Sequence, residues 1–281
     1  MGSNFETTAI RWHLGFYGAA ELELLEDRDI LEFQREYNLS KEPLRMDLLV
    51  IKKRADRQIR NEIGRIFKMY NVIEYKSPDD NLSIDDYYKT VGYACLYKGL
   101  GDKVGEIPAE ELTISIFRER YPRELFKEMR KKGFVIKKRF RGIYYVTGNG
   151  LFDTQVVVMK SLDERTHRSL RVLSPMAKKE DVEAFLRQAN GLTGPGEKNN
   201  VEAVLQVSIQ ANRELYKEIR RRTVMCDALR ELMKDVIEEE VVKERQEIIR
   251  NLMVNTKWTA EQAMSAMNIP AEEWGIYRAM L

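Results

Sequence analysis

The sequence predicts an α/β protein, in which a mixed sheet with flanking helices is followed by a helical C-terminal region. Short apolar runs at residues 44–51 and 71–76 are typical of strands that are covered on both faces. Apolar residues at helical spacing occur before and between the strand-like runs. Beyond residue 163 strand-like runs give way to charged helical sequence, so we expect one domain over residues 1–165 and a helical region over 166–281.

The composition sets broad limits on the class of protein. A chain of 281 residues can form one or two domains with buried cores. Two cysteines are too few for a disulfide framework or a zinc cluster, and the net charge of +2 does not by itself indicate a nucleic-acid-binding protein. The chain has no apolar run of about 18 residues and no signal-peptide pattern, so we expect no membrane partner and a cytoplasmic location.

The first part of the chain should supply alternating helices and strands. The expected elements are a helix over 8–25, strands over 31–37 and 44–51, a helix over 56–69 and a strand over 71–76. The two helices are predicted from apolar residues that recur at helical spacing. Glu21 falls on the apolar stripe of the first helix and interrupts it.

Capping and turn residues predict the elements that follow. Ser83 and Asp86 form a capping-box-like start for a helix that ends near Gly99. Pro122 is placed to begin a helix that runs to residue 132, and Gly133 can close it. The remaining strands are expected over 112–117, 134–138, 143–146 and 155–159.

The C-terminal region should be almost entirely helical. We expect helix over much of 163–190, a linker near 191–200 that contains Gly-Pro-Gly, and charged helix over 201–253. Thr259 begins another capping box, and Pro270 should begin a last short helix. The region is the predicted surface for a homodimer, although its poor heptad regularity argues against a long coiled coil.

Two predicted strands carry charged residues in apolar surroundings. Asp47 lies in the run at 44–51, and Glu74 and Lys76 lie two residues apart in the next strand, so their side chains should share a face. Because a buried carboxylate needs a partner, two acids and an ammonium at one place are consistent with a divalent cation such as Mg²⁺, which prefers oxygen ligands. The alternative is that the acids pair with local basic residues, including Arg45.

The spacing of Asp47 and the Glu-Tyr-Lys triplet at 74–76 resembles that of the PD-(D/E)XK nuclease superfamily. The segments 39–47, 73–78 and 87–93 are similar to its recombination-promoting nuclease and transposase branch, and the similarity spans roughly residues 10–165. Met46 departs from the pattern, because the superfamily has proline there. The resemblance implies a restriction-endonuclease-like core and endonucleolytic cleavage of DNA with Mg²⁺, or alternatively Mn²⁺.

The resemblance also implies a role for each site residue. Asp47, Glu74 and the backbone carbonyl of Tyr75 would bind the metal ion, and Lys76 would position water or stabilise developing charge. A glutamate of the first helix often completes such sites. This position falls to Glu21, or to Glu23 if the helical register differs. The alternative for Glu21 is a structural ion pair with a basic residue.

A basic stretch over 127–141 is the candidate DNA-binding surface. Glu128 is its one acid, and two phenylalanines are interleaved with the basic residues, so the stretch could bind phosphates without sequence specificity. The candidate contacts are Lys131, Lys132, Lys137, Lys138 and Arg139, with Lys89 on the helix after the Glu-Tyr-Lys strand. The alternative is a solvated helix end followed by an edge strand protected by lysines.

The other candidate residues carry less information. His13 and His167 have no metal-ligand spacing, and no partner for His167 can be identified from the sequence. A second hypothesis for the whole chain is a DNA-binding or protein-interaction module with the same fold and without catalytic activity.

Overall fold

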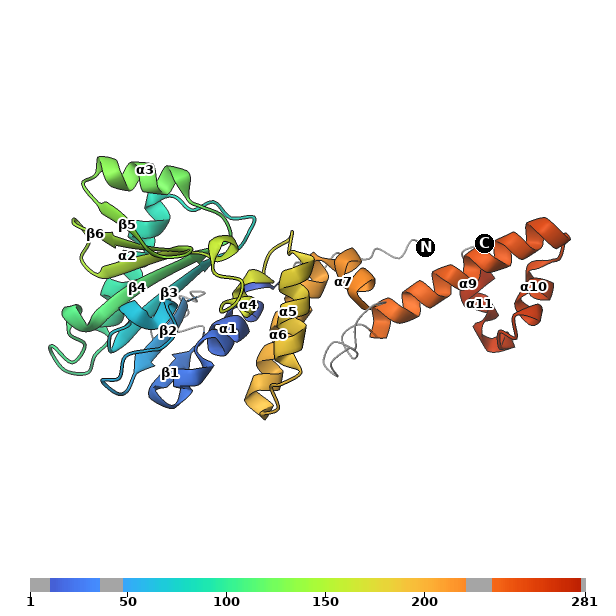
Figure 1. The fold of residues 1–281 in the computed structure, drawn as a ribbon, viewed down its shortest axis with the longest axis horizontal. Coiled ribbons are helices and arrows are strands. Elements are labelled where there is room, and N and C mark those ends of the chain that lie inside the picture. The colour runs from blue at the N-terminus through green and yellow to red at the C-terminus, as the bar shows by residue number, and fades with distance from the viewer. Residues whose placement is uncertain (1–10, 36–47, 221–233, 279–281) are drawn as a thin grey trace. The chain divides into compact units, whose positions relative to one another are not determined.

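Seven strands form a mixed sheet in the part of the chain that the structure describes (Figure 1). The structure is a computed structural model, and it describes residues 11–35, 48–220 and 234–278. The sheet order is β1-β2-β3-β4-β7-β6-β5. The strands are β1 (Leu31–Gln34), β2 (Leu48–Lys53), β3 (Tyr70–Lys76), β4 (Leu112–Arg118), β5 (Val135–Phe140), β6 (Ile143–Thr147) and β7 (Asp153–Val158). The mixed sheet confirms the predicted α/β class.

The pairing directions divide the sheet into three parts. β1, β2 and β3 pair antiparallel, β3, β4 and β7 pair parallel, and β7, β6 and β5 pair antiparallel. The carboxyl ends of β3, β4 and β7 therefore lie at the same edge of the sheet. β5 is the terminal strand of the described sheet, with one unpaired side.

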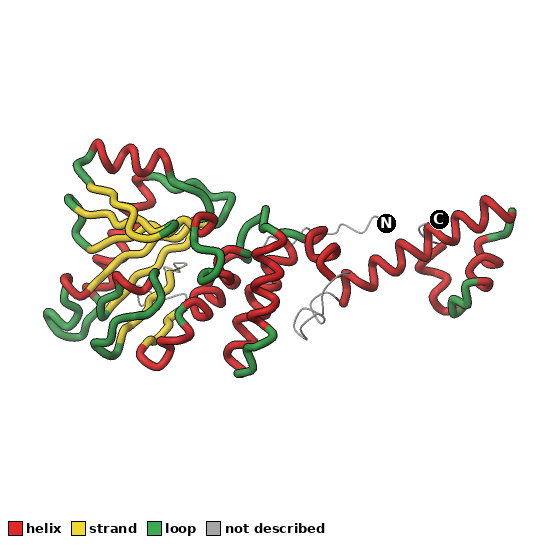
Figure 2. Tube along the Cα trace, in the orientation of Figure 1, coloured by secondary structure: helices red, strands yellow, loops and turns green. Residues whose placement is uncertain are grey.

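Helices cover both faces of this sheet (Figure 2). In the described residues up to 220, the α-helices are α1 (Trp12–Glu23), α2 (Ile84–Gly99), α3 (Arg123–Lys131), α4 (Arg168–Arg171), α5 (Lys179–Ala189), α6 (Pro195–Ala211) and α7 (Arg213–Arg220). Short 3₁₀ helices are η1 (Leu25–Ile30), η2 (Ile63–Ile66), η3 (Ala109–Glu111) and η4 (Met159–Ser161).

The two faces of β3 have different neighbours. Val72 belongs to a core cluster that includes Tyr87 of α2 and Phe126 of α3. Tyr75 points to the opposite face, where its ring stacks on Phe16 of α1 with 4.4 Å between ring centroids. Because side chains alternate along a strand, every second residue after Val72 faces α2.

α1 in turn packs closely on α6. A Cβ atom placed on Gly18 would lie 2.8 Å from the Asn200 carbonyl oxygen, so a larger residue would force the helices apart. This packing places α6 on the sheet-containing unit. The compact units divide between Cys226 and Asp227, whereas the sequence predicted a boundary near residue 165.

Two predicted elements differ from those in the structure. The helix expected over 56–69 is reduced to η2, because the chain before it is fixed by contacts with η1: the Arg60 N–H donates to the Asp27 carboxylate at 2.8 Å. The linker expected near 191–200 contains the start of α6. Its proline occupies the first helical turn, and the Glu197 carboxylate accepts a hydrogen bond from the Gly194 N–H at 3.0 Å.

The second unit is helical. It contains α9 (Lys234–Thr256), α10 (Ala260–Ala266), η5 (Ala271–Glu273) and α11 (Trp274–Arg278). The predicted capping box at Thr259 is confirmed, because its hydroxyl accepts from the Gln262 N–H at 3.2 Å. Ile249, Met264 and Tyr277 are buried in a small core. The predicted homodimer contact of this region stays a prediction.

Candidate active site

Glu74 and Lys76 lie together at the carboxyl end of β3, on the face that is covered by α2. The Lys76 Nζ lies 3.5 Å from Glu74 Oε1 and 2.8 Å from Asp86 Oδ1. The Glu74 side chain is 11% exposed and that of Lys76 is 13% exposed, so water reaches both only in part. The structure thus brings this predicted pair together and adds a second carboxylate to it.

Asp86 was identified from the sequence only as a capping residue. In the structure its Oδ2 accepts hydrogen bonds from the Ser83 N–H at 2.8 Å and from the Ser83 hydroxyl at 2.7 Å. This cap fixes the carboxylate in the first turn of α2, and leaves Oδ1 directed at Lys76. The available sequence signal was an acidic cap on the helix that follows the Glu-Tyr-Lys strand.

The surroundings of Lys76 stabilise its charged form. Burial by itself lowers the pKa of Lys76, but the hydrogen bonds and charges of Asp86 and Glu74 outweigh burial and raise this pKa above its usual value. Burial raises the pKa of Asp86, while Lys76 and Ser83 together lower it below the usual range. Lys76 is therefore a cation at neutral pH, which suits charge stabilisation and not the role of a general base.

Asp47 and the backbone carbonyl of Tyr75 are the other two ligands predicted with this pair. Asp47 lies outside the described residues. The first residue of β2, Leu48, pairs with Glu74 in the antiparallel register. The ring of Tyr75 is buried on the α1 face, and burial raises the pKa of its hydroxyl. The ligand roles of Asp47 and of the Tyr75 carbonyl stay predictions.

Glu21 lies in a different polar group, on α1. Its Oε1 accepts from Arg35 Nη2 at 2.7 Å, and its Oε2 accepts from Asn200 Nδ2 at 3.0 Å. Arg28 approaches Oε2 at 3.4 Å. These contacts agree with the structural alternative for Glu21, because both carboxylate oxygens already have partners.

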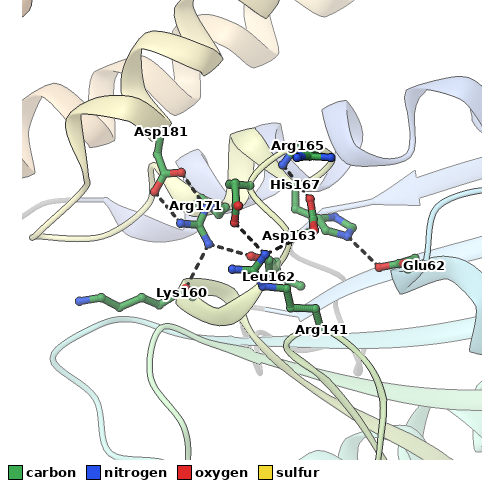
Figure 3. A network of polar contacts seen from close by, with 10 residues as sticks. Glu62, Arg141, Lys160, Leu162, Asp163, Arg165, His167, Arg171 and Asp181 are labelled. Carbon is green, nitrogen blue, oxygen red and sulfur yellow. Dashed lines mark hydrogen bonds and ion pairs between the residues drawn. The ribbon is translucent and has the colours of Figure 1, made fainter.

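Glu23, the alternative to Glu21, belongs to a buried network around His167. Glu23 Oε2 lies 2.7 Å from His167 Nδ1, and Glu23 Oε1 accepts from the Ser169 hydroxyl at 2.7 Å. His167 Nε2 faces Glu62 Oε2 at 3.5 Å, as Figure 3 shows. Burial lowers the pKa of His167, but Glu23 and Glu62 more than offset this and raise it. The sequence identified no partner for His167, and the structure supplies two.

Arg171 donates hydrogen bonds in a neighbouring group of polar residues (Figure 3). Its Nε and Nη2 donate to the two carboxylate oxygens of Asp181, each at 2.8 Å. Its Nη1 donates to the carbonyl oxygens of Lys160 at 3.1 Å and Leu162 at 2.7 Å. The guanidinium is thus almost fully satisfied inside the protein, which indicates a structural role.

The basic stretch lies on α3 and on the terminal strand β5. Lys131 pairs with Glu128 at 2.7 Å, and Lys89 of α2 lies over the Tyr93 ring, 5.4 Å from its centroid. The other candidates are exposed and form no ion pair with any described residue: Lys132, Lys137, Lys138 and Arg139. These cations, at the end of α3 and on β5, have no ion-pair partner among the described residues and are available to an anionic partner.

Three comparisons with known proteins add no relative. No family model matches the chain, and neither a similar curated protein nor a similar solved structure was found. Within residues 11–35, 48–220 and 234–278, no set of three or more His, Cys, Asp or Glu side chains is arranged to hold a metal ion. None of the helices in these ranges combines the length and the apolar composition needed to cross a bilayer.

Proposed function

We propose that this protein is a Mg²⁺-dependent endonuclease that hydrolyses DNA phosphodiester bonds. The observation that carries the proposal is the cluster of Glu74, Lys76 and Asp86 at the carboxyl end of β3. The element order from α1 to β4 is helix, three strands, helix, strand, which is the order expected of a restriction-endonuclease-like core. This order supports the superfamily assignment.

The donor atoms around β3 fit a hard cation. Mg²⁺ is usually held by one or two carboxylates and keeps several waters, so Glu74 and Asp47 with the Tyr75 carbonyl would suffice. The contact between Lys76 Nζ and Glu74 Oε1 is long at 3.5 Å, and Glu74 would exchange it for a contact with the cation. When bound, Mg²⁺ supplies a Lewis acid for the phosphoryl oxygens, and Mn²⁺ is an alternative ion. Glu21 would have to release Arg35 and Asn200 to join.

Lys76 and Asp86 divide the remaining work between them. The Lys76 ammonium places a positive charge beside the site, where it stabilises negative charge on a phosphate. Asp86 holds that ammonium through the cap of α2, and so acts as a positioning residue. The DNA backbone would be bound by four exposed cations: Lys132, Lys137, Lys138 and Arg139. Lys89 and Lys131 are the further candidates.

A plasmid-nicking assay tests the proposal. With Mg²⁺ the wild type should convert supercoiled plasmid to open circle, and EDTA should stop it. Glu74→Gln, Lys76→Met and Asp47→Ala should each lower the rate by at least about 100-fold, because each removes a charge beside the reacting phosphate. Glu32→Gln is the matched control, because Glu32 lies on β1, the first strand of the sheet, and its carboxylate pairs with Arg54. Wild-type rates for Asp47→Ala or Glu74→Gln would refute the assignment.

One observation favours a second function. Lys76 is already neutralised by Glu74 and Asp86, as in a closed charge cluster of structural origin. The alternative is a module that binds DNA or a protein on the same fold without cleavage. Salt-sensitive DNA binding together with undetectable Mg²⁺ binding and no nicking would establish it.

A further inference from the structure

Arg118 is the last residue of β4, and it lies directly beside Lys76. In the parallel register of β3 and β4, Lys76 is paired with Arg118, and Glu74 with Ile116. Neighbouring strands are about 4.8 Å apart, and paired residues direct their side chains to the same face. The Arg118 side chain therefore leaves the sheet on the same face as Glu74 and Lys76, at the same edge.

No described carboxylate contacts the guanidinium of Arg118. Arg118 is half-buried, and its Nε is buried without a hydrogen-bond partner in the described part of the chain. Among the described residues it forms no ion pair, in contrast to Arg171, whose guanidinium donates to Asp181 and to two carbonyl oxygens. Burial lowers the pKa of Arg118, with the charge of Glu119 acting in the opposite direction, yet a guanidinium remains protonated in proteins.

The two cations at this edge differ in what they can still bind. Lys76 has two carboxylate neighbours, so its charge is balanced within the protein. Arg118 carries a charge that is partly removed from water, and no carboxylate in the described ranges contacts it. An anion would relieve that desolvation, and the planar guanidinium matches the two oxygens of a phosphate group.

We propose that Arg118 forms a phosphate-binding subsite beside Lys76, which holds a phosphate of the nucleic-acid backbone next to Glu74. The inference rests on the proposed function for the identity of the anion. Phosphate binding by Arg118 does not require catalysis, because the subsite can be occupied when no metal ion is bound. Arg118 is thus assigned to substrate binding, and Glu74 to metal binding.

Binding without a metal ion separates the two assignments. A fluorescein-labelled DNA duplex and its single strand are titrated with the full-length protein in EDTA, at several salt concentrations. Arg118→Gln should weaken binding about tenfold and reduce the slope of log K against log salt by about 0.7–0.9, as expected for one lost phosphate contact. Arg118→Lys should recover part of the affinity, and the exposed Arg123 of the neighbouring helix supplies the control variant Arg123→Gln.

A structural role for Arg118 predicts different results. Removing an uncompensated charge should leave the melting temperature of Arg118→Gln equal or higher, whereas removing a structural contact would lower it. The proposal is overturned if Arg118→Gln binds DNA with wild-type affinity and salt slope, if its affinity falls only along with its melting temperature, or if the wild type binds neither DNA. Nicking by the wild type and its loss in Glu74→Gln test the nuclease independently of these results.

Discussion

The two faces of the sheet differ in how completely their charged groups are matched. On the side of α1, Glu23 is bonded to His167 and Ser169, and Arg171 is bonded to Asp181. On the side of α2, Glu74 is buried, whereas Lys76 and Asp86 are half-buried. Arg118 adds a positive charge there, and no carboxylate in the part of the chain that the structure describes contacts it. Removing one partner of an enclosed ion pair is costly because the other charge stays buried, whereas a partly exposed charge without a contacting counter-charge can bind a ligand.

The largest effect on stability should come from breaking the enclosed pair of Arg171 and Asp181. Arg171→Met leaves the Asp181 carboxylate buried and unpaired, so the free energy of unfolding should fall by about 3–5 kcal/mol. Chemical denaturation monitored by circular dichroism measures the change. Adding Asp181→Leu to Arg171→Met should restore much of the loss. If Arg171→Met alone were as stable as the wild type, the Arg171–Asp181 pair would not be an enclosed pair whose partners need each other.

His167 should make the stability of the first unit depend on pH. Its folded-state pKa is raised above the ordinary value of 6.5, so the stabilisation is fully present below this pH and is lost as pH rises through the folded-state pKa. His167→Gln should lower the free energy of unfolding by about 1.5–3 kcal/mol near pH 6, and by less at higher pH. Urea unfolding of both proteins across pH measures the difference, and a constant difference would contradict a charged His167.

Asp86 should affect the site more than the fold. Asp86→Asn removes a negative charge from Lys76 and weakens a helix cap, so the expected loss of stability is about 1 kcal/mol. Cleavage should fall about 10–100-fold, as for other groups that orient a functional side chain. The neighbouring Asp85 is exposed and also lies in the first turn of α2, so Asp85→Asn is the matched control. Equal nicking rates for the two variants would remove Asp86 from the site.

The exposed cations of β5 should affect DNA binding without affecting stability. The combined variant Lys137→Gln, Lys138→Gln, Arg139→Gln should reduce the salt slope of DNA binding by about 2–3 if all three residues contact phosphates. Its melting temperature should match that of the wild type. Fluorescence anisotropy at several salt concentrations measures the slope.

A variant with the same change in charge controls for net charge. Exposed basic residues at the N-cap of α5, in α5 and in α6 supply it: Lys178→Gln, Arg187→Gln and Lys198→Gln. If both variants weaken DNA binding equally, the effect of β5 is one of overall charge, and the strand is not a specific surface.

The sequence was sufficient where local pattern and final environment agreed. The strand at 71–76 was predicted because its apolar run and alternation indicate the strand that the fold contains. The helix begun by Ser83 was predicted from its capping residues, which also cap it in the structure. The helix predicted over 56–69 was wrong because the apolar residues of this segment are buried although its backbone is mostly irregular. Ile59 and Ile63 are 1% and 2% exposed, and Arg57 and Arg60 tie the chain to Asp27.

The site was predictable only in part, because several of its contacts connect distant segments. Glu74 and Lys76 could be placed together from their spacing on a strand. The pairing of Lys76 with Arg118 depends on the register of β3 and β4, and no local pattern specifies that register. The partners of Glu21 likewise include Asn200, which reaches it only because α6 packs on α1.

The proposed nuclease requires that Glu74, on the α2 face of the sheet, binds a divalent cation. Calorimetric titration with Mg²⁺ and Mn²⁺ of the wild type, Glu74→Gln and Glu32→Gln tests it most directly. We predict metal binding by the wild type and by Glu32→Gln, and its loss in Glu74→Gln. Absence of metal binding in the wild type, or unchanged binding in Glu74→Gln, would contradict the claim and leave Glu74, Lys76 and Asp86 as a structural charge cluster.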